Sequence, residues 1–90
     1  GNDSLLNYLK KELIYPETCK KDSISGVVLI EFIIEKDGSI SDVSALIKVH
    51  PDLDAEAIRV VKNMPKWEPS AVRGTPHRTF MQLPIRFSLE

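Results

Sequence analysis

Residues 26–49 read GVVLIEFIIEKDGSISDVSALIKV, and this stretch decides the fold. From Gly26 onward the residues alternate with period two, and both faces of the segment are largely apolar, which favours a strand in the middle of a sheet. The pair Asp37-Gly38 follows directly and supplies the positive φ angles of a tight turn. We therefore expect a hairpin centred on Asp37 and Gly38.

The second strand of this hairpin is predicted over residues 40–49, ending before Pro51. Ile40 is out of phase with the apolar residues that follow it, so we expect a β-bulge near Ser41 and Asp42. Val43, Ala45, Ile47 and Val49 are expected to share one face of this strand.

An amphipathic helix is predicted before the hairpin, capped by Asp3 or Ser4. It should end near Tyr15, because Pro16 disfavours helical angles in the residue before it. Residues 20–23 are interpreted as a solvated connector between this helix and the first strand. The apolar stripe of the helix consists of Leu5, Leu6, Leu9 and Leu13.

A second amphipathic helix is predicted after the hairpin, capped by Asp52 or Asp54 and closed by Pro65. Residues 66–76 then form an ordered crossing loop, which we expect Trp67 to pin to the core. The buried stripe of the helix consists of Leu53, Ala57, Val60, Val61 and Met64.

The last segment alternates cleanly and predicts a third strand with one apolar face. The order helix-strand-strand-helix-strand predicts an α+β fold, in which two helices cover one face of a three-stranded antiparallel sheet. The inward residues of the third strand are Thr79, Met81, Leu83, Ile85, Phe87 and Leu89.

Size, charge and cysteine content limit the class of protein. Ninety residues and 10.2 kDa provide for one core, so residues 1–90 are expected to form a single domain. A formal net charge of −1 argues against nucleic acid as a partner, and no apolar run approaches the roughly 20 residues that span a bilayer. Cys19 is the only cysteine, which excludes an internal disulfide and a thiolate zinc cage.

Neither catalysis nor a metal site is predicted. Free cysteine usually packs as a hydrophobe, so Cys19 is interpreted as half-buried, with His50 and His77 on the surface rather than as its catalytic partners. Two isolated histidines with scattered carboxylates fall short of the three or four converging ligands of a metal site. We expect no catalytic residue, no metal ligand and no cofactor.

Residues 57–89 carry an excess of basic side chains. Either a solvated surface or a binding surface for an acidic peptide explains this pattern, and the sequence leaves both interpretations open. The basic residues are Arg59, Lys62, Lys66, Arg73, Arg78 and Arg86, against the single acidic residue Glu68 before the last strand ends.

The third strand has the features of an open sheet edge. Pro84 has no N–H for a sheet ladder, so this strand is predicted at the edge with that position facing outward. Alternate residues point their backbone groups to the same side, and an open edge can accept a guest strand, either a peptide or a second copy that would form a homodimer. The predicted partner-binding residues are His77, Arg78, Thr79, Phe80, Met81, Gln82 and Leu83.

Short motifs rich in proline, glycine and aromatic residues punctuate the chain. They are Tyr15-Pro16, Ile24-x-Gly26, Phe32, Asp37-Gly38-x-Ile40, Leu53-Asp54-x-x-Ala57, Met64-Pro65-Lys66-Trp67-x-Pro69, Gly74-x-Pro76 and Pro84-Ile85-x-Phe87. Over about residues 12–90 these motifs together resemble the C-terminal domain of TonB, a periplasmic energy-transducing protein of Gram-negative bacteria. The positions expected to be structural are Tyr15, Pro16, Gly26, Asp37, Gly38, Pro65, Trp67, Pro69, Gly74 and Pro84.

The resemblance implies a non-enzymatic periplasmic domain that pairs with a short strand, the TonB box, of an outer-membrane transporter. It also implies an upstream membrane helix and linker, which tether the domain to the inner membrane and connect it to a proton-driven motor. The alternative is an interaction or sensor domain of a larger envelope protein, such as a membrane metallopeptidase. The upstream sequence would separate the two, because a metallopeptidase would carry several membrane helices and a His-Glu-x-x-His motif.

Overall fold

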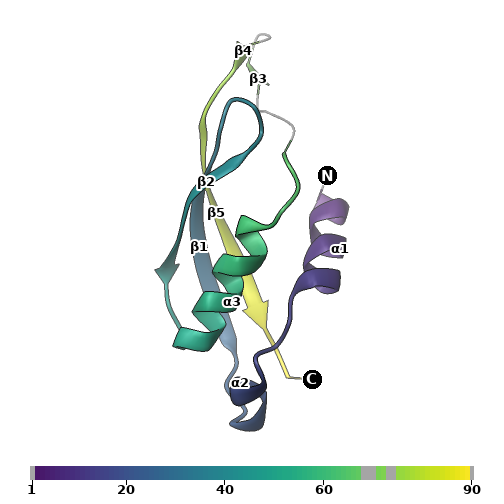
Figure 1. Cartoon of the computed structure of the whole chain (residues 1–90), viewed down its shortest axis with the longest axis vertical. Coiled ribbons are helices and arrows are strands. Elements are labelled where there is room, and N and C mark those ends of the chain that lie inside the picture. The colour runs from purple at the N-terminus through teal and green to yellow at the C-terminus, as the bar shows by residue number, and fades with distance from the viewer. Residues whose placement is uncertain (1, 68–70, 73–74, 90) are drawn as a thin grey trace.

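The computed structural model describes residues 2–67, 71–72 and 75–89, and it has the predicted α+β architecture (Figure 1). Helices α1 and α3 cover one face of an antiparallel sheet with strand order β2-β1-β5, and a short β3-β4 ribbon extends one end of the molecule. The elements are α1 (Asn2–Glu12), α2 (Glu17–Lys21), β1 (Gly26–Ile34), β2 (Ile40–Ile47), α3 (Pro51–Lys62), β3 (Ala71–Val72), β4 (Thr75–Pro76) and β5 (Thr79–Phe87).

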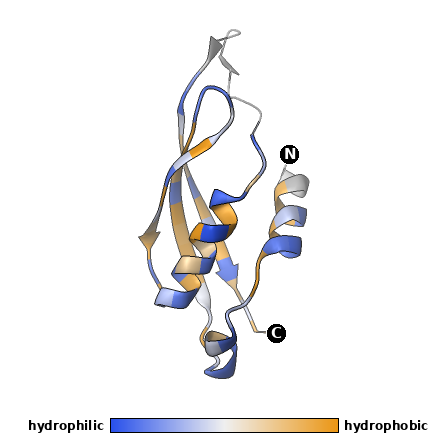
Figure 2. Ribbon diagram, in the orientation of Figure 1, coloured by the Kyte–Doolittle hydropathy of each residue, from blue (hydrophilic) through white to orange (hydrophobic). Residues whose placement is uncertain are grey.

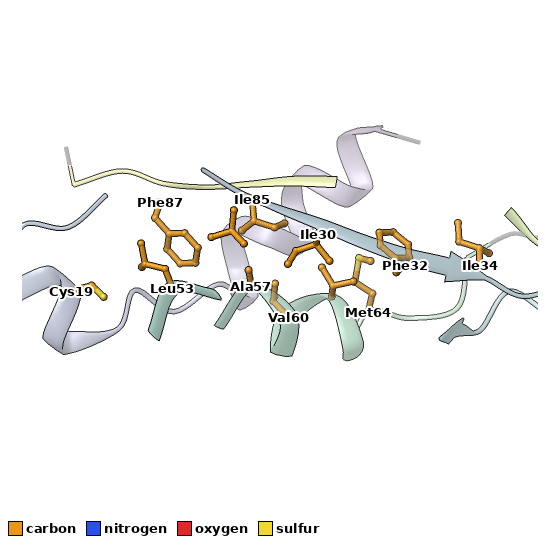
Figure 3. Packing of buried hydrophobic residues seen from close by; sticks show 12 residues of the cluster. Cys19, Ile30, Phe32, Ile34, Leu53, Ala57, Val60, Met64, Ile85 and Phe87 are labelled. Carbon is orange, nitrogen blue, oxygen red and sulfur yellow. The ribbon is translucent and has the colours of Figure 1, made fainter. Parts of the chain in front are cut away.

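Strand β1 is central, as the apolar character of both its faces predicts. Its inner face packs against α3, and Figure 3 shows Ile30 and Phe32 facing Val60 of that helix and Met64, which lies just beyond its end. None of the described helices covers its outer face, yet Ile33 is only 7% exposed there, between the flanking strands. The inner residues of β1, all at most 4% exposed, are Val28, Ile30, Phe32 and Ile34.

Strand β2 contains the predicted bulge and a second one. Asp42 has a positive φ of 50°, and the pairing with β1 shifts there by one residue. A second shift between Ala45 and Ile47 turns Ile47 to the outer face, where it is 56% exposed. The prediction that Ile47 shares a face with Val43 and Ala45 is therefore wrong, because a bulge reverses the side-chain alternation, and Val49 lies beyond the end of the strand. The strand also ends at Ile47, two residues before its predicted end.

The hairpin turn is held by the start of the crossing segment. Gly38 has a φ of 89°, and its carbonyl accepts a hydrogen bond of 2.8 Å from the Trp67 N–H. A Cβ at position 38 would lie 2.0 Å from the Trp67 carbonyl oxygen, so only glycine fits. The partly buried Trp67 ring packs against the core with its centroid 6.0 Å from that of Phe32, which confirms that Trp67 pins this segment.

The remainder of the predicted crossing loop differs from the expectation. The β3-β4 ribbon lies within residues 66–76, where the sequence predicted only a loop. Each of these strands has only two residues, which is too short for an alternation of apolar and polar residues to be recognised in the sequence. The predicted structural positions Pro69 and Gly74 lie outside the described residues.

Helix α1 begins at Asn2 and ends at Glu12, so Asp3 and Ser4 lie inside it and cannot cap it. Leu6 is 54% exposed, which corrects the predicted stripe, and Tyr8 takes its place on the core. The reason is helical geometry, because Leu5, Tyr8 and Leu9 follow the i, i+3, i+4 spacing that Leu6 breaks. The Tyr8 hydroxyl donates a hydrogen bond of 2.9 Å to the Val60 carbonyl of α3.

Helix α2 occupies part of the segment interpreted as a connector. Lys20 and Lys21 form its last turn, and only Asp22 and Ser23 follow as a turn. Cys19 is fully buried and lies at the same end of the core as Leu53 and Phe87 (Figure 3). One buried side chain in a five-residue helix leaves no periodic signal, which explains why the sequence did not reveal α2.

Helix α3 has the predicted buried stripe except for Met64, which is buried just beyond the end of the helix, and its cap differs from the prediction. His50 is the N-cap, and its Nδ1 accepts a hydrogen bond of 3.1 Å from the Asp52 N–H, while Pro51 is the first helical residue. Asp54 instead accepts a hydrogen bond of 2.9 Å from the Val49 N–H. The predicted cap at Asp52 or Asp54 is therefore wrong by at least two residues.

The described residues form an elongated molecule with principal extents of 49 × 23 × 15 Å. Figure 2 shows hydrophobic residues concentrated along the strands of the sheet, whereas α2 is mostly hydrophilic. None of the helices that the structure describes is long and apolar enough to cross a membrane.

Candidate binding edge

Strand β5 forms a long and regular edge of the sheet. All nine of its residues pair with β1 in one uninterrupted antiparallel register, from Gly26 with Phe87 to Ile34 with Thr79. Within the described ranges, no strand pairs with the other side of β5. The opposite edge, β2, is interrupted by two bulges, which disfavour pairing with a further strand. Of the two edges, β5 is the one suited to accept a guest.

The position of Pro84 indicates which backbone groups are free. Pro84 lies opposite Leu29 in the pairing with β1 and has no N–H to donate. In an antiparallel strand the backbone groups of alternate residues point to the same side. Phe80 and Gln82 lie four and two positions from Pro84 along the strand, so we infer that their N–H and C=O groups, like the backbone of Pro84, face the open side. Met81 and Leu83 then bond to β1.

The side chains of the predicted partner-binding residues divide between the two faces of the sheet. Thr79, Met81 and Leu83 point inward and are partly buried, whereas Phe80 and Gln82 are exposed on the outer face. Phe80 is 74% exposed, the highest exposure among the large hydrophobic residues that the structure describes. His77 and Arg78 lie before β5, in the segment that follows β4, and both are exposed.

Arg78 is paired with an acidic residue of the neighbouring hairpin. Its guanidinium donates hydrogen bonds of 2.7 and 3.3 Å to the Glu35 carboxylate, which also accepts one from the Ser41 hydroxyl. The bonds from Arg78 and then Ser41 lower the pKa of Glu35 below its usual value, and the same pair raises the pKa of Arg78. Arg78 therefore fixes the start of the edge to the hairpin.

Other basic residues of the second half of the chain also have acidic partners. Arg59 forms a salt bridge of 2.7 Å with Glu56, and Lys66 lies 3.9 Å from Asp37. The basic excess predicted for residues 57–89 is thus reduced in the fold, because carboxylates from outside that range approach it. Arg86 is exposed on β5 itself and shares the phase of Phe80 and Gln82.

The segment between α1 and α2 is fastened to α3 by a charged cluster. Glu56 accepts hydrogen bonds from Arg59 at 2.7 and 2.8 Å and from the Ile14 N–H at 2.7 Å, and Arg59 also donates to the Glu12 carbonyl at 2.9 Å. Burial by itself raises the pKa of Glu56, but the bonds from Arg59 and Ile14 outweigh it, so the pKa lies below its usual value. An open groove lies beside this cluster, between Pro16 and α3.

Tyr15 joins this segment to the sheet. Its hydroxyl donates to the Ile24 carbonyl, and its ring meets Phe87 edge-on at 5.6 Å between centroids. At the adjoining end of β1, Gly26 has a φ of 151°, and a Cβ there would lie 3.0 Å from the side chain of Val49. The contacts of Tyr15 and Gly26 are thus structural, and both lie at the end of the sheet away from His77.

Cys19 and His50 come together, contrary to the expectation of surface histidines. The Cys19 Sγ lies 3.3 Å from His50 Nδ1, and the Thr18 hydroxyl donates a hydrogen bond of 2.6 Å to the Asp52 carboxylate. The sequence could not reveal this cluster, because 31 positions separate Cys19 from His50 and α2 was not predicted. His77, in contrast, is exposed and lies near the β5 edge.

The described residues form a small α+β domain whose β5 edge pairs with no other described strand, and an exposed edge of this kind is one that can accept an added strand. The chain belongs to the family described as Gram-negative bacterial TonB protein C-terminal, whose profile matches residues 11–89. This family consists of non-enzymatic interaction domains of the Gram-negative periplasm, which take part in energy transduction and interact with outer-membrane transporters.

Two solved structures have a similar fold. Both are solution structures of the Helicobacter pylori TonB C-terminal domain, and each superposes with a TM-score of 0.73. The one of residues 194–285 is 24% identical and covers 97% of this chain and 91% of its own. The longer one, of residues 179–285, is 23% identical and covers 100% of this chain and 84% of its own. No curated protein matches the chain.

Proposed function

We propose that this chain is a single TonB-type domain that binds a TonB-box peptide of an outer-membrane transporter by strand addition to β5. The observation that carries the proposal is the uninterrupted nine-residue edge, which no described strand covers. Strand addition draws its affinity from main-chain hydrogen bonds and its specificity from neighbouring side chains. In the full-length protein, an upstream helix and linker would tether the domain to the inner membrane and to a proton-driven motor.

The guest strand would pair mainly with the first part of β5. Phe80 and Gln82 each offer one outward N–H and one outward C=O, whereas Pro84 offers only its carbonyl. Pairing is therefore strongest over His77 to Leu83 and weaker beyond Pro84. On the outer face a guest side chain would lie beside the exposed Phe80, and Arg86 would favour a carboxylate further along.

A matched pair of variants at one position tests this proposal. Gln82→Pro removes one outward N–H and leaves the inward Met81 and Leu83 unchanged, whereas Gln82→Ala removes the side chain but keeps the N–H. A receptor-derived box peptide is titrated into the labelled domain while amide shifts are followed. We expect parent and Gln82→Ala to bind with similar affinity and shifts clustered on His77 to Leu83, and Gln82→Pro to bind at least about fivefold more weakly, from the loss of roughly 1 kcal/mol per hydrogen bond.

The fold of Gln82→Pro is checked first by its amide spectrum. If the proline variant is folded and binds as tightly as Gln82→Ala, backbone pairing at this edge is wrong. Shifts that cluster on the outer face of β1 or on α1 would also contradict the proposal. Two box peptides, one N-methylated at odd and one at even positions, test the same pairing from the side of the peptide. Only the peptide whose methyl groups replace the N–H groups facing β5 should lose affinity.

A further inference from the structure

Three side chains with metal-ligating atoms converge where α2 meets the start of α3, at the end of the molecule away from the β3-β4 ribbon (Figure 1). The ligand atoms of Cys19, His50 and Asp52 all lie within 4.8 Å of one another. Cys19 belongs to α2, whereas His50 caps α3 and Asp52 lies in its first turn. The fold assembles this cluster, since no local sequence motif contains it.

We propose that this cluster binds a divalent ion of the zinc class through the Cys19 thiolate, the His50 imidazole and the Asp52 carboxylate. Thiolate sulfur, imidazole nitrogen and carboxylate oxygen are the three donor types that zinc takes in proteins, and three protein ligands leave a fourth position for water. The thiolate and imidazole disfavour Mg²⁺ and Ca²⁺, which prefer oxygen ligands.

The spacing of the donors suits such an ion. At the usual bond lengths, a sulfur and a nitrogen on one tetrahedral zinc lie about 3.5 Å apart. The Cys19 Sγ and His50 Nδ1 are 3.3 Å apart before any ion is added, so both can ligate with little movement. The Asp52 carboxylate is oriented from behind by the Thr18 hydroxyl at 2.6 Å, as the outer partner of a ligand commonly is.

Binding would exchange protons and hydrogen bonds in a defined way. In the metal-free arrangement Nδ1 accepts the Asp52 N–H, so it carries no proton itself and can accept the Cys19 S–H as well. The ion would form bonds to Sγ, to Nδ1 and to a carboxylate oxygen. Because Nδ1 has one lone pair, its hydrogen bonds from the Asp52 N–H and the Cys19 S–H would break, the Asp52 N–H would turn to solvent, and the thiol proton would leave to solvent. Because Cys19 is buried and Asp52 is exposed, the ion would enter from the Asp52 side.

The site is separate from the proposed peptide edge. Cys19 packs at the end of the core where Phe87 pairs with Gly26, whereas Thr79 to Leu83 pair with β1 near its other end. Ion binding would join α2 to α3 and stabilise the folded domain in proportion to ion concentration. Ion binding goes beyond the proposed function, and a negative result for the ion site would not contradict peptide binding at β5, nor the reverse.

Titration with Co²⁺, a spectroscopic substitute for Zn²⁺, tests the site. We expect the parent domain to develop a saturable thiolate-to-cobalt charge-transfer band and the visible bands of tetrahedral cobalt, both removed by one equivalent of Zn²⁺. Cys19→Ser keeps a small hydrogen-bond donor beside His50 but no thiolate, so it should lose the charge-transfer band and bind at least about tenfold more weakly. His77→Gln, which removes the other histidine, should bind as the parent does.

A second variant and a second readout make the result independent of how well Cys19→Ser folds. Asp52→Asn retains the shape of the side chain but lowers its ligand strength, and should weaken Co²⁺ binding while retaining the charge-transfer band. Calorimetry in buffers of different ionisation enthalpy should show about one proton released per ion. Absence of the charge-transfer band in the parent, or loss of binding in His77→Gln, would overturn the proposal and leave Cys19 and His50 a purely structural pair.

Discussion

At the scale of single residues, hydrogen bonds between segments far apart in the chain fix the geometry. Glu56 is the clearest case, because it ties α3 to the Ile14 N–H and holds Arg59, which in turn reaches the Glu12 carbonyl. These contacts link α1 to α3 through a side chain that is only 11% exposed. A carboxylate in this setting makes stability depend on pH.

We predict that Glu56→Gln lowers the free energy of unfolding at pH 7 by on the order of 1 kcal/mol, and that this difference shrinks in acid. The pKa of Glu56 is lower in the folded state than its usual 4.5, so its contribution is present above that value and is lost as the pH falls through the folded-state pKa. Urea unfolding of the parent and of Glu56→Gln from pH 7 to pH 3 measures this difference in the free energy of unfolding. A difference that grows in acid would contradict this assignment.

At the scale of elements, the crossing segment stabilises the β1-β2 hairpin through Trp67. Its N–H bonds to Gly38 in the turn, and its ring packs on Phe32 of the central strand. The side chain thus closes the core just beyond the end of α3, where Met64 is also buried.

We predict that Trp67→Ala destabilises the domain by about 3 kcal/mol, the lower end of the range for large aromatic truncations, because Trp67 is only partly buried. Trp67→Phe keeps an aromatic ring beside Phe32 and should cost less than half as much. Chemical denaturation of the three proteins provides the comparison. Equal stability of parent and Trp67→Ala would show that the ring contributes nothing to the core.

The elements that sequence reasoning found are those with long and regular patterns. The alternation of β1 predicted its type and central place, and the alternation of β5 and the stripe of α3 also predicted their inner faces. Leu89 is the exception: it was expected to point inward, but it lies beyond the end of β5 and is 39% exposed. The resemblance to TonB domains was confirmed by the family match. Short or irregular features were missed. Helix α2 has one buried residue, Cys19, which gives no periodic pattern in the sequence. The second bulge in β2 depends on the pairing with β1 and not on local sequence.

The two candidate sites differ in the same way. A proline in an alternating strand is a local signal, so Pro84 pointed to the β5 edge from the sequence alone. The Cys19–His50 contact is a consequence of packing α2 against α3, and no spacing rule predicts ligands 31 positions apart. Sequence can therefore indicate an edge, but only the assembled fold brings together a cluster of side chains.

At the scale of the whole molecule, we propose that the β5 edge of the sheet is left open for a guest strand. Helices α1 and α3 cover the inner face, bulges interrupt the β2 edge, and β5 keeps a regular ladder on one side only. Under the proposed function, a transporter peptide would supply a fourth strand, and force on that peptide would be carried through backbone hydrogen bonds to β5 and then to β1.

Amide hydrogen exchange along β5, measured with and without a box peptide, tests whether this edge is open and accepts a strand. In the free domain we predict slow exchange at Met81 and Leu83, whose N–H groups bond to β1, and fast exchange at Phe80 and Gln82, whose N–H groups face outward. Bound peptide should slow Phe80 and Gln82 and leave the other two nearly unchanged. Protection of Phe80 and Gln82 in the free domain, or no change at either on binding, would contradict an open edge that accepts a guest strand.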